Sequence, residues 1–287
     1  MLIERGGYDL LESPSNAYML TQTHHLKPDD LATLWRELDS TTALPLVAGP
    51  DAYQSLDELL HWWREACQDS KRLSAPQAHV YLMWPSRETW GIPVLYQHGF
   101  IPQTSLAIRD QNKGSSAQVT TGRDPIVRIA TLGDIDIIVS LWLEVVAYDA
   151  ALGVGSNHPR APTLLRGAVL ALFQRCETWI WLAEVDGNAV GLCIVDLPAF
   201  CAGVAPYVRK AQPVYISTLG TQMAHRGTGV GTALIRHVHS ALNNAGHRTI
   251  LLHHALLNPL SAPFWARLDY RPLWTIWRSN RTTATGA

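Results

Sequence analysis

The 287-residue sequence has few of the features that mark specialised protein classes. It has only four cysteines and no C-x-x-C pair, which argues against a zinc knuckle or a redox motif. No window approaches the roughly 18 consecutive apolar residues of a membrane span, and the first residues lack the apolar stretch of a signal peptide. We therefore expect a cytoplasmic protein without a membrane partner or a metal site.

An excess of charge of one sign is also missing. The 23 Lys and Arg residues nearly balance the 24 Asp and Glu residues, so the net charge is −1. This balance gives no basic footprint for nucleic acid over the whole chain, and we expect no such partner. What is present is ordinary for a globular protein, with 47% hydrophobic and 16% charged residues.

A polar stretch divides the chain into two predicted domains. Residues 111–124 are rich in Gly, Ser and Thr and have no apolar periodicity, which is typical of a linker. We predict a first domain at residues 1–110 and a second at residues 125–287. In the first domain, apolar spacing predicts helices over 28–39 and 55–67.

The second domain has a regular order of predicted elements, β-α-α-β-β-β-α-β-α-β. Two of its strands meet at Asp186-Gly187, a strong hairpin signal. Later, a strand over 214–221 precedes a helix over 231–244. This order predicts the α/β class, in the form of a mixed α+β domain with one central sheet flanked by helices.

The connection between that strand and that helix contains a candidate phosphate site. It reads Arg226-Gly227-Thr228-Gly229-Val230-Gly231. Glycines let backbone amides approach an anion closely, and a helix N-terminus adds free N–H groups and a positive dipole end. Arg226 can add a charge-assisted contact. The spacing fits neither the Rossmann nor the Walker A pattern, and it predicts a diphosphate site of another kind.

The segment resembles the GNAT superfamily of acyl-coenzyme-A-dependent N-acyltransferases. Arg226, Gly229 and Gly231 match the family pattern [QR]-x-x-G-x-[GA]. The resemblance covers about residues 125–280, because further family features fall in place downstream, at Asn258, Phe264, Trp265 and Tyr270. The first domain resembles a smaller, degenerate copy, in which residues 94–100 echo residues 263–270 and Tyr96 takes the place of the family's catalytic tyrosine.

The resemblance implies a cofactor, acetyl-CoA or another acyl-CoA, and a set of residues that bind it. Amides of the glycine segment would hold the pyrophosphate, and the pantetheine arm would pair with the preceding strand where it separates from its neighbour. The implied cofactor residues are Leu219, Gly220, Thr221, Arg226, Gly227, Thr228, Gly229, Val230, Gly231, Thr232, Asn258 and Trp265. The amine of a small-molecule acceptor would attack the thioester directly. The protein would be a monomer or a homodimer.

The catalytic groups are less well defined. The family often has a tyrosine as general acid where this chain has Trp265, whose indole N–H is no useful proton donor. Tyr270 or water is the alternative acid. Asp196 and either His253 or His254 are candidate bases, with His254 preferred, because only one of the adjacent histidines can face the site. Tyr215 is a further polar group on the strand. These gaps leave a second hypothesis, a non-catalytic acyl-CoA-binding sensor or partner protein.

Overall fold

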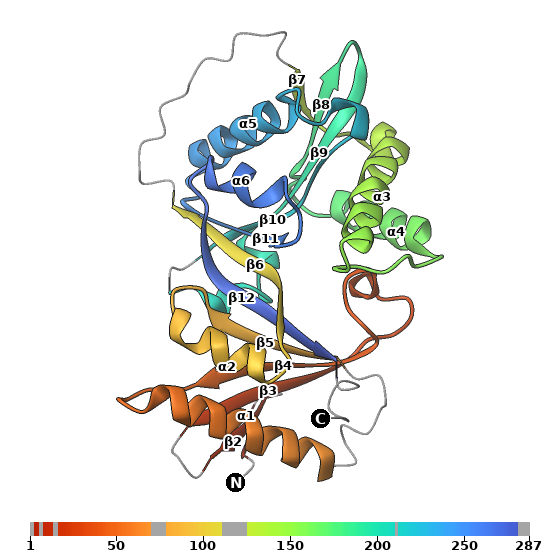
Figure 1. Cartoon of the computed structure of the whole chain (residues 1–287). Helices are drawn as coiled ribbons and strands as arrows, with labels where there is room; N and C mark the ends of the chain where they lie inside the picture. The colour runs from red at the N-terminus through yellow and green to blue at the C-terminus, as the bar shows by residue number, and fades with distance from the viewer. Residues whose placement is uncertain are drawn as a thin grey trace. The chain divides into compact units, whose positions relative to one another are not determined.

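The computed structural model describes residues 3–5, 8–13, 17–69, 79–110, 125–209 and 212–280 (Figure 1). The predicted linker, 111–124, lies outside these residues. The chain divides into two units. Unit 1 comprises residues 1–106, 255–259 and 272–287, and unit 2 comprises residues 107–254 and 260–271. This division differs from the continuous domains expected at 1–110 and 125–287.

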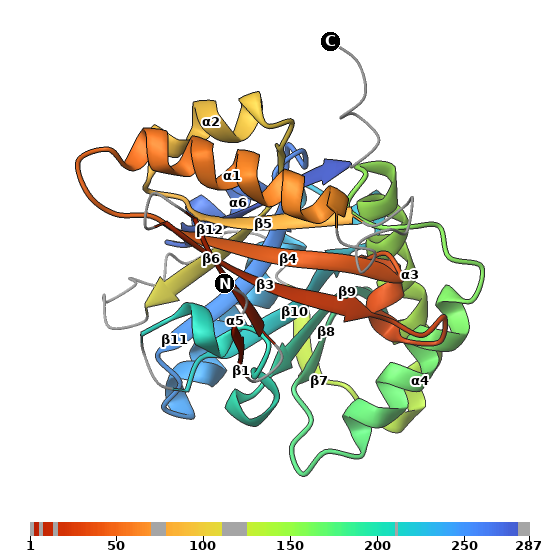
Figure 2. The same cartoon turned by 90° about the horizontal axis from the view of Figure 1, so that it is seen from below.

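Unit 1 is a sheet with two helices on one face. Its strands follow the order β1-β2-β3-β4-β5-β12. Helices α1 and α2 lie on one side of this sheet (Figure 2), where buried side chains such as Leu59, Leu82 and Leu95 form the core. The bounds are β1 Ile3–Arg5, β2 Tyr8–Glu12, β3 Tyr18–His25, β4 Asp39–Leu46, α1 Ala52–Asp69, β5 His79–Pro85, α2 Ile92–Gln97 and β12 Arg271–Asn280.

Unit 2 has helices on both faces of its sheet. Its strands follow the order β11-β10-β9-β8-β7. Helices α3 and α4 cover one face, and α5 covers the other (Figure 1). The bounds are β7 Ile126–Ile129, α3 Ile135–Ala151, α4 Ala161–Phe173, β8 Ile180–Val185, β9 Asn188–Asp196, β10 Val214–Thr221, α5 Val230–Asn244, β11 Thr249–Ala255 and α6 Ser261–Ala266.

The predicted fold class is confirmed. From β7 to β12 the elements follow the predicted order, β-α-α-β-β-β-α-β-α-β. The hairpin between β8 and β9 turns at Asp186 and Gly187, whose φ angles of 49° and 79° are those of a type I′ turn. In the first half, by contrast, the helix expected over 28–39 is only a 3₁₀ turn at Leu31–Leu34.

The closing strands are exchanged between the units. Strand β12 follows α6 of unit 2, but it pairs antiparallel with β5 of unit 1, from Trp274↔Pro85 to Asn280↔His79. Strand β6 (Ile101–Asp110) follows α2 of unit 1, but its residues 107–110 belong to unit 2. Most of β12, which follows α6 of unit 2, therefore belongs to unit 1. The end of β6, which follows α2 of unit 1, belongs to unit 2.

The two units repeat one arrangement, β4-α1-β5-α2 in unit 1 and β10-α5-β11-α6 in unit 2. Parallel pairing ends at Ala43↔Leu82 in unit 1 and at Ile216↔Leu252 in unit 2. The spacing of 170 residues between Leu82 and Leu252 is also the spacing between Leu95 and Trp265. The two units therefore share this arrangement, with the same spacing across one strand and one helix.

The ends of α2 and α6 show which residues of the two units correspond. Phe100 N–H donates to Leu95 O at 3.0 Å, and Tyr270 N–H donates to Trp265 O at 3.1 Å. Leu95 therefore corresponds to Trp265. The expectation that Tyr96 takes the catalytic place was wrong by one residue, because Tyr96 is 53% exposed and corresponds to Ala266.

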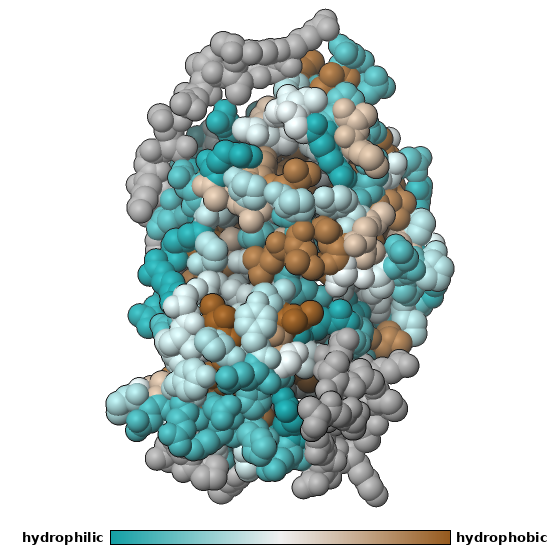
Figure 3. Space-filling view, in the orientation of Figure 1, coloured by the Kyte–Doolittle hydropathy of each residue, from teal (hydrophilic) through white to brown (hydrophobic). Residues whose placement is uncertain are grey.

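Apolar side chains also reach the surface. Figure 3 shows apolar residues on one face among more numerous hydrophilic ones. In the part of the chain that the structure describes, none of the helices is both long enough and apolar enough to cross a membrane.

Candidate functional site

The connection from β10 to α5 has a backbone that requires glycine at two positions. Gly227 and Gly229 have φ angles of 78° and 95°, in the left-handed region that other residues rarely adopt. No atom lies within 4 Å of the place that a Cβ would take at either glycine, so backbone conformation rather than packing requires them. Gly229 is also the N-cap residue of α5.

The first turn of α5 presents unused backbone donors. The bond from Ala233 N–H to Gly229 O is the first of the helix, so the amides of Val230, Gly231 and Thr232 have no partner within it. Gly227, Thr228 and Gly229 are exposed beside them. Together with the helix dipole, these groups form an accessible anion-binding end, as expected from the glycine spacing.

Of two glycines beside this loop, Gly220 is required by close packing, whereas a Cβ at Gly231 would make ordinary van der Waals contacts. A Cβ at Gly220, near the end of β10, would clash with Cγ2 of Val145 on α3. At Gly231, a Cβ would lie 3.6 Å from Cγ2 of Thr221 and 3.8 Å from the ring of Phe264. Gly220 therefore lets α3 approach β10, and Gly231 packs beside the strand end and α6.

Side chains of α3 also hold the loop. The guanidinium of Arg226 lies over the ring of Tyr148 at 4.5 Å, and its Nε donates to Thr221 O at 3.3 Å. The Glu144 carboxylate accepts a hydrogen bond from Met223 N–H at 3.2 Å. Arg226, expected only as an anion ligand, thus also fixes the loop against α3.

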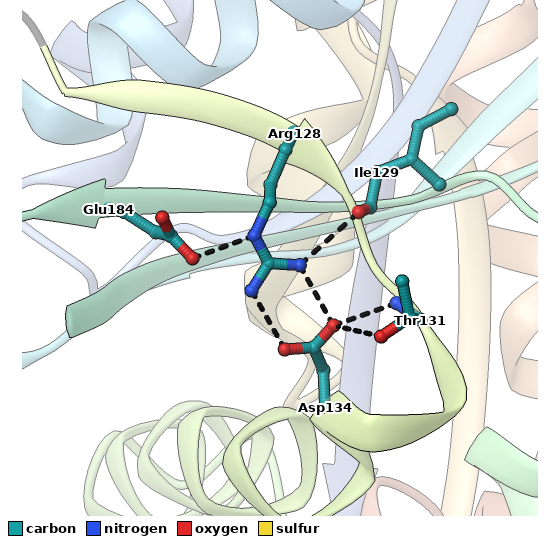
Figure 4. A network of polar contacts seen from close by, with 5 residues as sticks. All are labelled: Arg128, Ile129, Thr131, Asp134 and Glu184. Atoms are coloured by element: carbon teal, nitrogen blue, oxygen red, sulfur yellow. Dashed lines mark hydrogen bonds and ion pairs between the residues drawn. The ribbon is translucent and has the colours of Figure 1, made fainter. Parts of the chain in front are cut away.

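Helix α3 is itself fixed by a charged network at its start (Figure 4). Arg128 donates to both carboxylate oxygens of Asp134 at 2.8 Å and to Glu184 at 2.7 Å. Asp134 also accepts from Thr131 N–H, which completes a capping box. The hydrogen bonds from Arg128 hold the pKa of Asp134 well below its usual range. The network joins α3 to β7 and β8.

Strands β10 and β11 pair over only part of their length. The parallel register covers Val214–Ile216 and Ile250–Leu252, whereas β10 continues to Thr221. On its other edge, β10 pairs with β9 as far as Thr221, with a bulge between Ile216 and Thr218. In the described chain, the second half of β10 is thus paired on one side only, as the resemblance implied for the pantetheine arm.

Tyr215 and His253 meet where this pairing ends. The Tyr215 hydroxyl lies 3.0 Å from His253 Nδ1, and the two rings meet edge to face. Burial and the nearby Asp196 carboxylate raise the pKa of Tyr215 well above its usual value. His254, the histidine preferred from the sequence, is only 9% exposed and points the opposite way along the strand. The structure therefore places His253, rather than His254, beside Tyr215.

Asp196, the other candidate base, already has a cationic partner. Arg175 Nη1 donates to its carboxylate at 2.6 Å, and the same guanidinium stacks on Phe200 at 3.8 Å. The Asp196 side chain is only 17% exposed. The Asp196 carboxylate is thus engaged by Arg175 and largely covered, which leaves it poorly placed to meet an acceptor.

Tyr270 and Trp265 are core residues. They are 5% and 7% exposed, and their rings meet edge to face at 5.0 Å. The Tyr270 hydroxyl and His239 Nε2 share a hydrogen bond of 2.8 Å, and burial lowers the pKa of His239 to about 3. This burial argues against a proton-donor role for Tyr270 and against cofactor contact by Trp265. Asn258 belongs to the 255–259 segment of unit 1, and its cofactor role stays a prediction.

Comparison with known proteins identifies the family of this site. Residues 153–270 match the model of the acetyltransferase (GNAT) family. Most of this matched segment lies in unit 2. The match includes β10, the glycine loop and α5, so the predicted resemblance is confirmed, and with it acyl-CoA-dependent acetyl transfer as the general activity of the family.

Solved structures show the same fold over nearly the whole chain. A GCN5-related N-acetyltransferase from Sphaerobacter thermophilus is 18% identical, with a TM-score of 0.59 over 96% of this chain and 82% of that one. A functionally unknown conserved protein from Staphylococcus epidermidis is 12% identical, with a TM-score of 0.51 over 97% and 92%. No curated protein matches the sequence. The fold of nearly the whole chain therefore recurs in other solved structures.

Proposed function

We propose that the protein is an N-acyltransferase that moves an acetyl or other short acyl group from acyl-CoA to a small-molecule amine. The observation that carries this proposal is the family match over the loop with Gly227 and Gly229 in left-handed conformation. The amine nitrogen would attack the thioester carbon directly, forming an amide and releasing the CoA thiol. Unit 1 is then a degenerate copy without a cofactor loop.

The geometry of unit 2 fits the cofactor. The amides of residues 227–232 would hold the pyrophosphate, with Arg226 beside them. The edge of β10 at Leu219, Gly220 and Thr221, which is free of β11, would hydrogen-bond to the pantetheine arm. Bound CoA supplies the activated acyl group, and the chain supplies these binding groups and the acceptor side around Tyr215.

Calorimetry with CoA tests the cofactor site. Valine at Gly229 cannot adopt the φ angle of 95° without strain, so G229V should weaken CoA binding at least tenfold. The matched control is G49V in the β4–α1 connection of unit 1, where φ is 105° and no atom crowds a Cβ. Its CoA affinity should equal that of the wild type. Intact CoA binding by a folded G229V variant would refute the assignment.

One observation favours a second candidate, a non-catalytic acyl-CoA-binding protein. The family's usual acid position holds Trp265, which is buried. Thiol release separates the two functions. Purified protein with acetyl-CoA and a panel of small amines should release free thiol if it is a transferase. CoA binding without thiol release for any amine would favour the binding protein.

A further inference from the structure

The structure assigns proton transfer in this reaction to the hydrogen-bonded pair Tyr215–His253, with Tyr215 as the catalytic residue that meets the acceptor amine. His253 is a positioning residue that receives the proton through Tyr215. This assignment rests on the proposed acyl transfer. It differs from the sequence-based choice of His254 as the base and of Tyr270 as the acid.

The strand register places both side chains on one face. Val214 and Ile216 belong to the core beneath α5, so Tyr215 between them points to the face that α3 covers. Ile250 and Leu252 belong to the same core, which turns His253 to the side of Tyr215. The α3 face and the pantetheine edge of β10 meet at this point, because pairing with β11 stops at Ile216↔Leu252.

Unit 1 shows that the fold does not require this pair. Its strands β4 and β5 end their pairing at the equivalent residues, and Thr42 and Met83 stand where unit 2 has Tyr215 and His253. Thr42 is instead hydrogen-bonded to His24 and Arg36. The pair is therefore specific to the unit that carries the glycine loop.

The surroundings keep the phenol protonated. The titratable groups that act on Tyr215 besides His253 are Asp196 of β9, Asp149 of α3 and Cys201 after β9. The two carboxylates disfavour a phenolate, and Asp196 is itself held by Arg175. Burial raises the pKa of Cys201 to about 11, so this group stays a neutral thiol. A neutral phenol can donate its proton to His253 Nδ1 and accept another on the same oxygen.

The acceptor enters as a free amine, and its nitrogen lone pair forms a bond to the thioester carbon. The amine proton passes to the Tyr215 oxygen while the Tyr215 proton passes to His253 Nδ1, which gives an imidazolium. The C–S bond breaks with its electrons on sulfur, and the CoA thiolate takes up the proton that His253 returns, directly or through water. The products are an amide and a thiol.

Kinetics on the full-length protein test the relay. Y215F should lower kcat by about 10²- to 10⁴-fold, the usual contribution of acid–base catalysis, with unchanged CoA affinity. In the wild type, kcat/KM should rise with pH in a step that belongs to the proton acceptor of the relay, besides the ionisation of the amine. H253Q should lose this step and keep only the ionisation of the amine. The control H237Q, at an exposed histidine of α5, should keep the wild-type profile. An unchanged profile in H253Q, or loss of the step in H254Q alone, overturns the assignment.

A spectroscopic test does not depend on turnover. Long-range ¹H–¹⁵N correlation spectra report which nitrogen of His253 carries the proton. The relay requires the Nε2–H tautomer in the wild-type protein, with Nδ1 as the acceptor, and a changed Nδ1 signal in Y215F. The Nδ1–H tautomer overturns the relay while leaving the proposed transferase intact. Absence of any thiol release by the wild type, with the Nε2–H tautomer present, instead overturns the proposed transferase.

Discussion

The two units make the same turn from strand to helix with very different connections. In unit 1, residues 47–51 link β4 to α1 and include one glycine in left-handed conformation, Gly49. In unit 2, residues 222–229 link β10 to α5 and contain Gly227, Gly229 and an arginine held against α3. The same strand-to-helix arrangement therefore forms with either connection. The candidate cofactor site belongs to the longer one, residues 222–229.

The largest expected effect is a loss of stability at two equivalent positions. It tests whether the buried side chain stabilises the fold in both units. W265A in unit 2 and L95A in unit 1 each remove a buried side chain, at a cost of about 3–5 and 2–5 kcal/mol in the free energy of unfolding. Urea denaturation measures both. W265Y, which restores the family's residue, should not raise kcat, because the ring lies in the core. A large gain in kcat would show that this position faces the cofactor.

A smaller effect is expected from crowding the contact of α3 with β10. G220A should destabilise unit 2 by about 1–3 kcal/mol, because the new Cβ meets Val145. V145A removes the clashing methyl groups, so the double variant should recover part of the loss in thermal denaturation. The control G203A adds a methyl group where no atom lies within 4 Å. Equal losses in G220A and G203A would contradict the packing argument.

The network that fixes α3 predicts a pH-dependent loss. D134N removes the charge that accepts the paired hydrogen bonds of Arg128 and should cost about 0.5–1.5 kcal/mol at neutral pH. Because the folded-state pKa of Asp134 is depressed, its contribution is complete above the usual carboxyl pKa and declines as the pH falls below it. Urea denaturation from neutral to acidic pH should show the wild type and D134N converging in acid. D136N, at an exposed residue of the same helix turn, should have a smaller effect.

The smallest expected effect concerns the arginine of the longer connection. Y148L removes the ring beneath Arg226, a contact worth about 0.5–1 kcal/mol at an exposed site. CoA affinity should fall by about two- to fivefold by calorimetry. Y53L in unit 1, which removes an exposed tyrosine of α1, should leave the affinity unchanged. If Y53L lost as much CoA affinity as Y148L, the loss in Y148L could not be attributed to its contact with Arg226.

Local patterns predicted much of unit 2. The Asp186-Gly187 turn and the R-x-x-G-x-G spacing are short-range signals, and both correspond to the structure because positive φ angles leave few residue choices. In unit 1 such signals are weaker. Strand β4, Asp39–Leu46, contains Pro45 and few apolar residues in alternation, and it was not predicted as a strand.

Two features of the site could not be read from the sequence for physical reasons. In β11, Ile250, Leu251 and Leu252 are all apolar and buried, so no alternation tells which face His253 takes. Which strand pairs with β12 depends on contacts nearly 200 residues away, as at Trp274↔Pro85, and no local pattern encodes such a partner.

The exchanged closing strand has a consequence for synthesis on the ribosome. Strand β5 emerges early but waits for β12, and at translation rates of about 5–20 residues per second the interval is on the order of 10–40 s. During that time one edge of the nascent sheet has no partner from its own chain. Such an edge is a template for other chains, so chaperone binding or fast elongation at this stage would protect the yield of folded protein.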